Sequence, residues 1–292
     1  MRRLYRWRLR IMAAAVLLIL LPTALRLLLP DGAPRSALGL GPLLGAVLMG
    51  LVLVLGRAGL PDDPVEARVV EAPVRGRWRA LNSPGTRVPS HGTRAYGQAF
   101  AIDLVHEPAE AVRPAFGSGG SFRPVGDYPA FGEPVLAMVA GVVVAASDGQ
   151  RDHRARSSWP GFAYLMVEGA VRELGGPRFV VGNHVVVRTP DGVHALAAHL
   201  RRGSLRVAPG DTVVAGQQVA ECGNSGNSSE PHVHAQLMDA ASLWEAQGLP
   251  MAFRGVEVAA DGDAATGPAD ALPANDEVME AAGRGSSDAG AR

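Results

Sequence analysis

Cysteine is almost missing from this chain of 292 residues, which contains only Cys222. One cysteine excludes an intrachain disulfide and every zinc motif built from several cysteines. Because Cys222 lies beside Gly223 and no other feature singles it out, we expect a small buried residue rather than a catalytic thiol. Aromatic residues are also scarce, at 5%. Glycine, alanine, valine and proline are abundant, which is typical of many short strands joined by tight turns.

The chain also lacks a net charge, since 28 Lys and Arg balance 28 Asp and Glu. A balanced chain gives no global reason to expect a nucleic-acid partner. The balance conceals two local excesses. The last part of the chain leans acidic, and arginines crowd the start, at Arg2, Arg3, Arg6, Arg8 and Arg10.

Two apolar runs occupy residues 1–60, and we interpret this segment as a membrane anchor. Residues 37–56 carry no charge, and a helix of about 20 residues rises about 30 Å, enough to cross a bilayer core. Residues 11–29 are the second candidate. They contain Pro22 and Arg26, and an arginine is costly in hydrocarbon unless its side chain reaches the interface. A buried core helix is the ordinary alternative for each run.

The orientation of the anchor depends on how many of these runs cross the membrane. The arginine-rich start should remain in the cytoplasm. A signal peptide is the alternative for residues 11–29, but no clear small-x-small cleavage site follows, which favours an uncleaved anchor. Two spans would return the chain to the cytoplasm, whereas one span would place the rest of it outside.

Composition divides the remaining chain into three parts. Residues 61–75 begin rich in proline and aspartate and are predicted to be a linker. Residues 76–258 form the predicted globular domain, and residues 259–292 lack periodicity and are expected to be a disordered tail. No long amphipathic helix is evident, and the stretches Glu107–Glu133 and Gly149–Gly176 resemble loops laid over a sheet.

Short β-rich runs alternate with turns throughout the globular region, so we predict a mostly antiparallel β fold. The runs are EPVLAMVAGVVVAAS, RFVVGNHVVVRTPDGVHALAAHL, LRVAPGDTVVAGQQVAEC and PHVHAQL. The segment RTPDGVH places Pro-Asp-Gly between two such runs and therefore predicts a β-hairpin.

The segment PHVHAQL places two histidines one residue apart. Because alternate side chains of a strand point to the same face, His232, His234 and Gln236 share one face, and the apolar residues between them face a core. Two imidazoles at this spacing can converge on one site. A solvated polar face is the more ordinary interpretation of the pair taken alone.

Three further residues strengthen the expectation of a site. In QAFAIDLV, Asp103 shares its face with small alanines, while large apolar residues occupy the other face. A carboxylate in such a run needs a partner, because burying an unpaired charge is costly. In VHALAAHL, His199 shares its face with Ala195 and Ala197, and His91 lies in a turn-like stretch before the Asp103 strand.

These residue types suit metal-assisted hydrolysis. Two imidazoles and one carboxylate are a common ligand set for Zn²⁺, with the fourth position left to water. Zinc lowers the pKa of that water to about 7 and polarises a bound carbonyl. Spare histidines can then move protons and stabilise the developing charge.

Several motifs together resemble the M23 (lysostaphin/LytM-type) zinc metallopeptidases. They are EPVLAMVAGVVVAA, GNHVVVRTPDGVHALAAHL and VAPGDTVVAGQQVAECGNSGNSSEPHVHAQL, in the order and spacing of that family. The resemblance extends over most of residues 76–258. It implies a compact antiparallel β fold with a groove, and hydrolysis of peptide bonds in bacterial cell-wall peptidoglycan.

The resemblance also implies roles for five residues. His91, Asp103 and His234 correspond to the zinc ligands. His199 and His232 correspond to the catalytic histidines, which orient or deprotonate the water and stabilise the tetrahedral intermediate.

The sequence departs from the family at the first ligand, which in many members precedes the aspartate as His-x-x-x-Asp. Here GTRAYGQAFAI separates His91 from Asp103. His106 is the alternative ligand, but strand alternation places it on the face opposite Asp103, so we favour His91. Ordinary strand or surface positions are expected for the other histidines, His153, His184 and His194.

We therefore predict a membrane-anchored zinc metalloendopeptidase that acts on peptidoglycan. Its substrate lies outside the cytoplasm, so we expect the domain there, with residues 37–56 as the sole span. One alternative is a non-catalytic LytM-type binding or regulatory domain acting on cell-wall hydrolases, which the unusual His91 spacing supports. Another is a β-rich phosphotransfer module with a reactive histidine, against which Asp103 argues.

Overall fold

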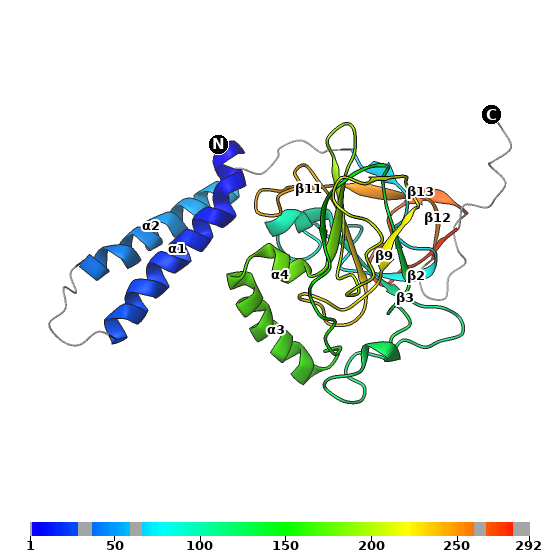
Figure 1. The fold of residues 1–292 in the computed structure, drawn as a ribbon, viewed down its shortest axis with the longest axis horizontal. Helices are drawn as coiled ribbons and strands as arrows, with labels where there is room; N and C mark the ends of the chain where they lie inside the picture. The colour runs from blue at the N-terminus through cyan, green and yellow to red at the C-terminus, as the bar shows by residue number, and fades with distance from the viewer. Residues whose placement is uncertain (1, 29–36, 59–65, 260–266, 283–292) are drawn as a thin grey trace. The chain divides into compact units, whose positions relative to one another are not determined.

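The computed structural model describes residues 2–28, 37–58, 66–259 and 267–282. The chain divides into two units, Met1–Pro64 and Val65–Arg292. The first is helical and the second is rich in β-strands (Figure 1).

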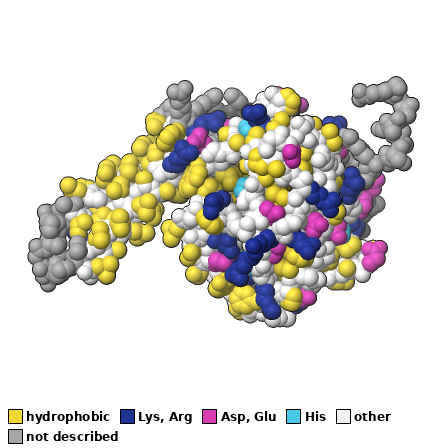
Figure 2. Space-filling view, in the orientation of Figure 1, with side chains coloured by type: hydrophobic (Ala, Val, Ile, Leu, Met, Phe, Trp, Pro, Cys, Tyr) yellow, Lys and Arg dark blue, Asp and Glu magenta, His cyan; other side chains and the backbone are white. Residues whose placement is uncertain are grey.

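Two apolar helices make up the first unit. Helix α1 spans Arg2–Leu28 and helix α2 spans Ala37–Ala58, and hydrophobic side chains cover both (Figure 2). Their segments Leu4–Leu28 and Leu38–Leu55 are each long and apolar enough to cross a membrane. Both helices thus have the length and composition that a membrane anchor requires.

The two helices pack closely because α2 carries glycines on the side that meets α1. A Cβ atom at Gly41 would lie 2.7 Å from Pro22 Cγ, and one at Gly45 would lie 2.6 Å from Ile19 Cγ1. Glycines four residues apart are a common contact motif of membrane helices, because they let backbones approach.

The second unit is built around a sheet of twelve strands, joined in the order β1-β12-β14-β2-β3-β10-β7-β6-β5-β8, with β11 paired to β10 and β13 to β12. Strands β4 and β9 form a separate pair. All pairings are antiparallel except that of β1 with β12. The strands are β1 Arg68–Val70, β2 Gly76–Leu81, β3 Ile102–His106, β4 Pro134–Leu136, β5 Gly141–Ser147, β6 His184–Arg188, β7 His194–Ala198, β8 Thr212–Val213, β9 Gln218–Glu221, β10 Val233–Met238, β11 Gly248–Leu249, β12 Met251–Ala259, β13 Ala269–Ala271 and β14 Val278–Ala281. The short helices are η1 Ala95–Phe100, η2 Val125–Asp127 and α4 Pro177–Val181, and α3 spans Trp159–Leu174.

Alternation along the central strands separates a core face from a polar face, as predicted. Val233, Ala235 and Leu237 of β10 are fully buried in the hydrophobic core, where Ile102 and Leu104 of β3 join them. The hairpin predicted at RTPDGVH is confirmed, since β6 and β7 pair antiparallel on either side of it. The mostly antiparallel β fold is therefore confirmed.

Helix α3 contradicts the prediction of a loop from Gly149 to Gly176. Ser158 caps its start by accepting a hydrogen bond from Gly161 N at 3.2 Å. The helix was not apparent from the sequence because its outward face is apolar rather than polar, so the usual amphipathic contrast is missing. By contrast, the stretch from Glu107 to Glu133 contains only η2 as regular structure and is a loop, as predicted.

The ordered fold also extends beyond residue 258, contrary to the predicted disordered tail. Strand β14 pairs with β12 on one side and β2 on the other, and Met279 is fully buried. Strands this short obtain their stability from partners far away in the sequence, which composition alone does not reveal. Likewise β1 lies within residues 61–75, predicted as linker, and pairs with β12.

Candidate metal centre

Two central strands bring a carboxylate and an imidazole face to face. Asp103 of β3 and His234 of β10 are directly paired in the antiparallel register. Their side chains therefore leave the sheet on the same side, and His234 Nδ1 lies 2.9 Å from Asp103 Oδ1. Both residues are buried.

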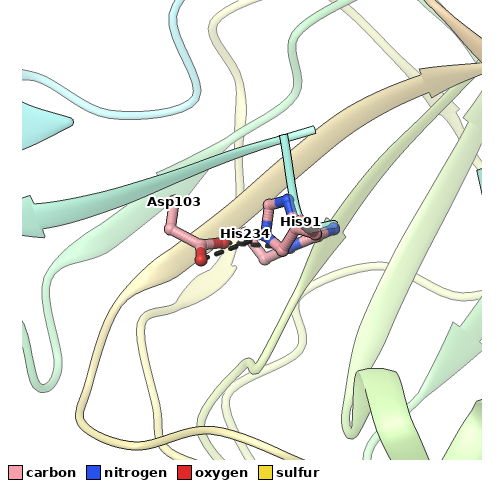
Figure 3. A group of neighbouring side chains, drawn as sticks. All are labelled: His91, Asp103 and His234. Atoms are coloured by element: carbon pink, nitrogen blue, oxygen red, sulfur yellow. Dashed lines mark hydrogen bonds and ion pairs between the residues drawn. The ribbon is translucent and has the colours of Figure 1, made fainter. Parts of the chain in front are cut away.

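The loop before β3 returns a second imidazole to the same carboxylate, although His91 is twelve residues away in sequence. His91 Nε2 lies 3.1 Å from Asp103 Oδ2, and Figure 3 shows both histidines directed toward Asp103. The intervening GTRAYGQAFAI segment folds into η1, where Tyr96 takes the left-handed backbone conformation with φ 58°. The long spacing is thus closed by a compact turn, as predicted for His91.

The position of His199 in the site does not follow from strand alternation. Ala197 pairs with Ala235 of β10 and faces the core, so continued alternation would send His199 there too. Instead, His199 follows the end of β7 in the left-handed conformation, with φ 60°. Its ring centroid lies 4.7 Å from that of His232 and 5.7 Å from that of His234. The expectation that His199 shares a face with Ala195 and Ala197 was therefore wrong.

His232 completes the cluster from the turn before β10. Its Nε2 lies 3.5 Å from Asp103 Oδ1. Its Nδ1 lies 2.8 Å from the carbonyl oxygen of Glu230 and 3.1 Å from Ser228 Oγ. The five predicted site residues thus form one cluster, in which three histidines contact the carboxylate of Asp103 and His199 packs against His232 and His234.

Hydrogen bonding assigns the protons of the two imidazoles nearest Asp103. Gln236 Nε2 donates to the carbonyl of Tyr96, so its Oε1 accepts from His234 Nε2 at 2.9 Å. Ser90 Oγ donates to the carbonyl of Ala101 at 2.7 Å and therefore accepts from His91 Nδ1. A neutral imidazole carries only one proton, so both rings present a bare nitrogen to the carboxylate.

The other two imidazoles are arranged in the same way. His199 Nδ1 donates to the carbonyl of Ser225 at 2.8 Å, and His232 Nδ1 donates to that of Glu230. Their Nε2 atoms are therefore the free ones. In each of these rings the outer nitrogen is engaged by the protein, which is how protein groups commonly orient metal-binding and catalytic histidines.

This donor set fits a bound divalent metal. Lone pairs of His91 and His234 face an acceptor, and a cation placed between them and Asp103 would interact favourably with all three. One metal ion satisfies both nitrogens, whereas protonating several adjacent imidazoles would place like charges together. One ligand atom from each of the three residues lies within 4.8 Å of the others. Ligands bound tetrahedrally to Zn²⁺ are about 3.4 Å apart.

Burial and charge act in opposite directions at this cluster. Burial disfavours ionised Asp103, but the nearby imidazoles of His91, His232 and His234 hold its pKa well below the usual range. Burial, with the charges of His232 and His234, holds the pKa of His199 well below its ordinary value. His199 is therefore neutral at pH 7, as a proton acceptor must be.

The rival ligand His106 lies outside this cluster. It stacks on Trp78 with ring centroids 4.7 Å apart, and its Nδ1 lies 3.3 Å from the carbonyl oxygen of Pro129. Backbone carbonyls also engage His153 Nε2, from Gly226 at 2.8 Å, and His184 Nδ1, from Gly182 at 2.8 Å. Cys222 is buried, as predicted, and burial raises its pKa well above the ordinary value.

Two residues that support the site were not recognised in the sequence. Asn82 donates to Asp103 Oδ2 at 2.8 Å, and Ser90 orients His91. Asn82 directly follows β2 and lies 21 residues before Asp103. No short sequence motif therefore links it to the other site residues. Ser90 is adjacent to His91, which is the only sequence signal for its role.

A groove with a volume of about 480 Å³ opens over the cluster. The five site residues form part of its lining, and helix α3 contributes apolar side chains to the wall: Phe162, Leu165 and Met166. A peptide can therefore lie between α3 and the histidine cluster.

Replacing Gln236 by leucine is expected to weaken metal binding without removing a ligand. The leucine fills a similar volume but leaves His234 Nε2 and the Tyr96 carbonyl without partners. Loss of such an outer hydrogen bond typically costs about 10–100-fold in metal affinity. Competition with a chromophoric chelator measures the change. Gln218→Leu, at a half-buried amide of β9 outside the site, is the control, and equal zinc affinity in the two variants would contradict the assignment.

Residues 164–245 match the sequence model of Peptidase family M23. This range contains His199, His232 and His234, while His91 and Asp103 precede it. The chain is also similar to the catalytic domain of lysostaphin from Staphylococcus simulans, with 23% identity over 44% of this chain and 86% of that chain and a TM-score of 0.27. The catalytic domain of the prophage-encoded M23 protein EnpA from Enterococcus faecalis, in a mutant form, matches with 21% identity over 50% and 92% and a TM-score of 0.28. The deep-sea M23 metalloprotease pseudoalterin matches with 17% identity over 65% and 76% and a TM-score of 0.30.

Proposed function

Since residues 164–245 of the β-rich domain match the sequence model of peptidase family M23, we propose that the domain is a zinc-dependent endopeptidase that hydrolyses peptide bonds of bacterial cell-wall peptidoglycan. The observation that carries this proposal is the cluster of four imidazoles, each with its outer nitrogen engaged, in which His91, His232 and His234 surround the buried Asp103 and His199 packs against two of these rings. A cluster of this kind supplies both a metal site and spare bases.

We assign His91 Nε2, one oxygen of Asp103 and His234 Nδ1 as the zinc ligands. When bound there, zinc lowers the pKa of a coordinated water and polarises the scissile carbonyl. Asn82 holds one Asp103 oxygen at 2.8 Å, which leaves the other directed toward His234 and His232. The carboxylate is thereby oriented before the metal binds.

We assign proton transfer to His199 and His232. His199 is neutral and anchored at Nδ1, so its Nε2 can accept a proton from the attacking water. His232 is anchored to the Glu230 carbonyl, and the nearby Asp103 raises its pKa against the opposing effect of burial. A histidine that holds its proton more firmly is suited to stabilise developing negative charge and to protonate the leaving amine.

Chelation and a substitution together test this function. We expect EDTA treatment to abolish digestion of purified peptidoglycan and Zn²⁺ to restore it. His199→Ala should retain zinc but lower kcat by about 100–10,000-fold, the range for a lost general acid or base. Release of new amino termini measures turnover, and zinc analysis measures retention. A chain that keeps zinc but cleaves no wall peptide would instead indicate a non-catalytic domain acting on cell-wall hydrolases.

We further propose that the apolar N-terminal helices attach the domain to the cell membrane, with the peptidase on the side of the cell wall. The support is the presence of two membrane-length helices and the location of the proposed substrate. This placement requires that α2 alone completes the crossing, because the arginine-rich start of α1 favours the cytoplasm. Added protease should then digest the domain on cells stripped of their wall.

A further inference from the structure

Helix α3 differs from an ordinary surface helix in that its outward side is apolar. Its inner side, at Gly161, Leu165 and Gly169, is buried. Its outward face, which we call the α3 face, consists of Trp159, Ala163, Val167, Val171 and Leu174, all exposed. These residues recur at helical spacing and include no charge. A water-facing helix normally carries its polar residues there.

The charged residues of α3 are instead engaged with the domain. Glu168 forms ion pairs with Arg156 and Arg172, and Glu173 accepts a hydrogen bond from the Tyr96 hydroxyl. The polar side chains that could have covered the outward face are thus held elsewhere. The α3 face therefore carries no charge because the charged residues of the helix bind groups of the domain instead.

Aromatic rings from a neighbouring loop enlarge this apolar surface. Phe116 and Phe122 are 46% and 42% exposed. Phe116 contacts Trp159 edge-on, with ring centroids 5.2 Å apart, and Phe122 contacts Tyr164 at 5.5 Å. Contiguous exposed apolar surface of this kind marks a site of protein or membrane contact, and exposed Trp and Tyr are typical of the membrane interface.

Two features favour a membrane over a protein partner. The exposed Arg154 and Arg178 lie just before and just after α3, where they can meet anionic lipid headgroups. In Figure 2, hydrophobic and cationic side chains gather together along the edge of the domain where Figure 1 draws α3. Apolar residues flanked by basic ones are the composition of helices that lie in the membrane interface.

The connection to the apolar helices keeps the domain close to a bilayer. Helix α2 ends at Ala58 and β1 begins at Arg68, and ten residue steps span at most about 35 Å. A domain of about 200 residues has a radius of gyration of about 16 Å. If α2 spans a bilayer, the tether therefore cannot hold the start of the domain more than about 35 Å from it, so the domain stays near the headgroups.

We propose that the α3 face binds the surface of the lipid bilayer, with Trp159, Val167 and Leu174 entering the headgroup region. This inference rests on the proposed membrane attachment and is independent of catalysis. It also gives the groove an orientation, because the opposite side of α3 lines it. The groove would then open beside the membrane surface.

Fluorescence quenching from the lipid tests the proposal on the full chain in vesicles of phosphatidylglycerol and phosphatidylethanolamine. The only native cysteine, Cys222, is fully buried, so single cysteines can be labelled with an environment-sensitive fluorophore. Val167→Cys is the test position. Val214→Cys is the matched control, because the two valines are 68% and 64% exposed. Val47→Cys, on α2, reports whether the anchor itself is inserted.

We expect nitroxide-bearing lipids to remove at least about half of the emission at position 167, since interfacial helices lie about 5–10 Å deep. The label at position 214 should remain accessible to aqueous iodide. Equal iodide access at both positions would overturn the proposal, as would protection of position 167 from both quenchers, which would indicate a protein cover. Loss of quenching at position 47 would refute the attachment and this inference together. Quenching at 47 but not at 167 would refute this inference alone.

Discussion

His234→Ala is expected to leave the protein without zinc and without detectable peptidase activity. His234 supplies a proposed ligand atom at the middle of β10, and its removal also leaves Gln236 Oε1 without its partner. Losses of outer hydrogen bonds alone cost about 10–100-fold, so loss of a ligand should exceed that range. Zinc content after gel filtration and the rate of wall digestion are the two measurements.

Two further variants make this test specific. His91→Ala should behave like His234→Ala, because both rings direct a bare nitrogen at Asp103. His106→Ala should retain zinc, because that ring is stacked on Trp78 outside the cluster. Zinc loss in His106→Ala with retention in His91→Ala would reverse the ligand assignment.

Ending the chain at Val258 should prevent the domain from folding, whereas ending it at residue 282 should have little effect. The shorter chain lacks β14, which lies between β2 and β12. Its loss leaves two unpaired strand edges and uncovers the core beside Met279. Burying each Val or Met side chain contributes about 1.5–3 kcal/mol, and each ladder hydrogen bond about 1 kcal/mol. The sum of these contributions approaches the free energy of unfolding of a whole domain, which is about 5–15 kcal/mol.

The same truncation should also affect the site. Ser83 donates to the carbonyl of Pro273 and, through its backbone, to Asn275, and it is adjacent to Asn82, which holds Asp103. Thermal melting followed by circular dichroism compares the two chains. A chain ending at residue 258 that melts within a few degrees of the longer one would show that β14 contributes little.

The polar face of β10 was predictable because the alternation of side chains along a strand depends only on that strand's own sequence. Alternation in PHVHAQL assigns His232, His234 and Gln236 to one side without knowledge of any partner strand. The β-hairpin at RTPDGVH was predictable for the same reason, since the turn residues and both strands lie within one short segment.

Features that depend on distant partners were not predictable in this way. His199 lies in the cluster because its backbone is left-handed, a conformation that the surrounding residues impose. Helix α3 was mistaken for a loop because its outward face is apolar, which removes the usual contrast between an apolar and a polar side. Strand β14 lies within residues 259–292, a segment whose composition predicted disorder, and its two neighbours in the sheet make it a strand.

Strand β10 has a neighbour on each side, β3 and β7, and this position has a consequence for motion. Amides in a strand that is paired on both edges exchange with solvent mainly when the whole domain opens. Amide exchange at His234 and Gln236 should therefore be among the slowest in the chain. The loop from Glu107 to Glu133 should open far more often, because its pairing among the described residues is limited to the β-bridge between Arg123 and Ala155. The proposed metal ligands on β3 and β10 thus stay fixed while this loop opens.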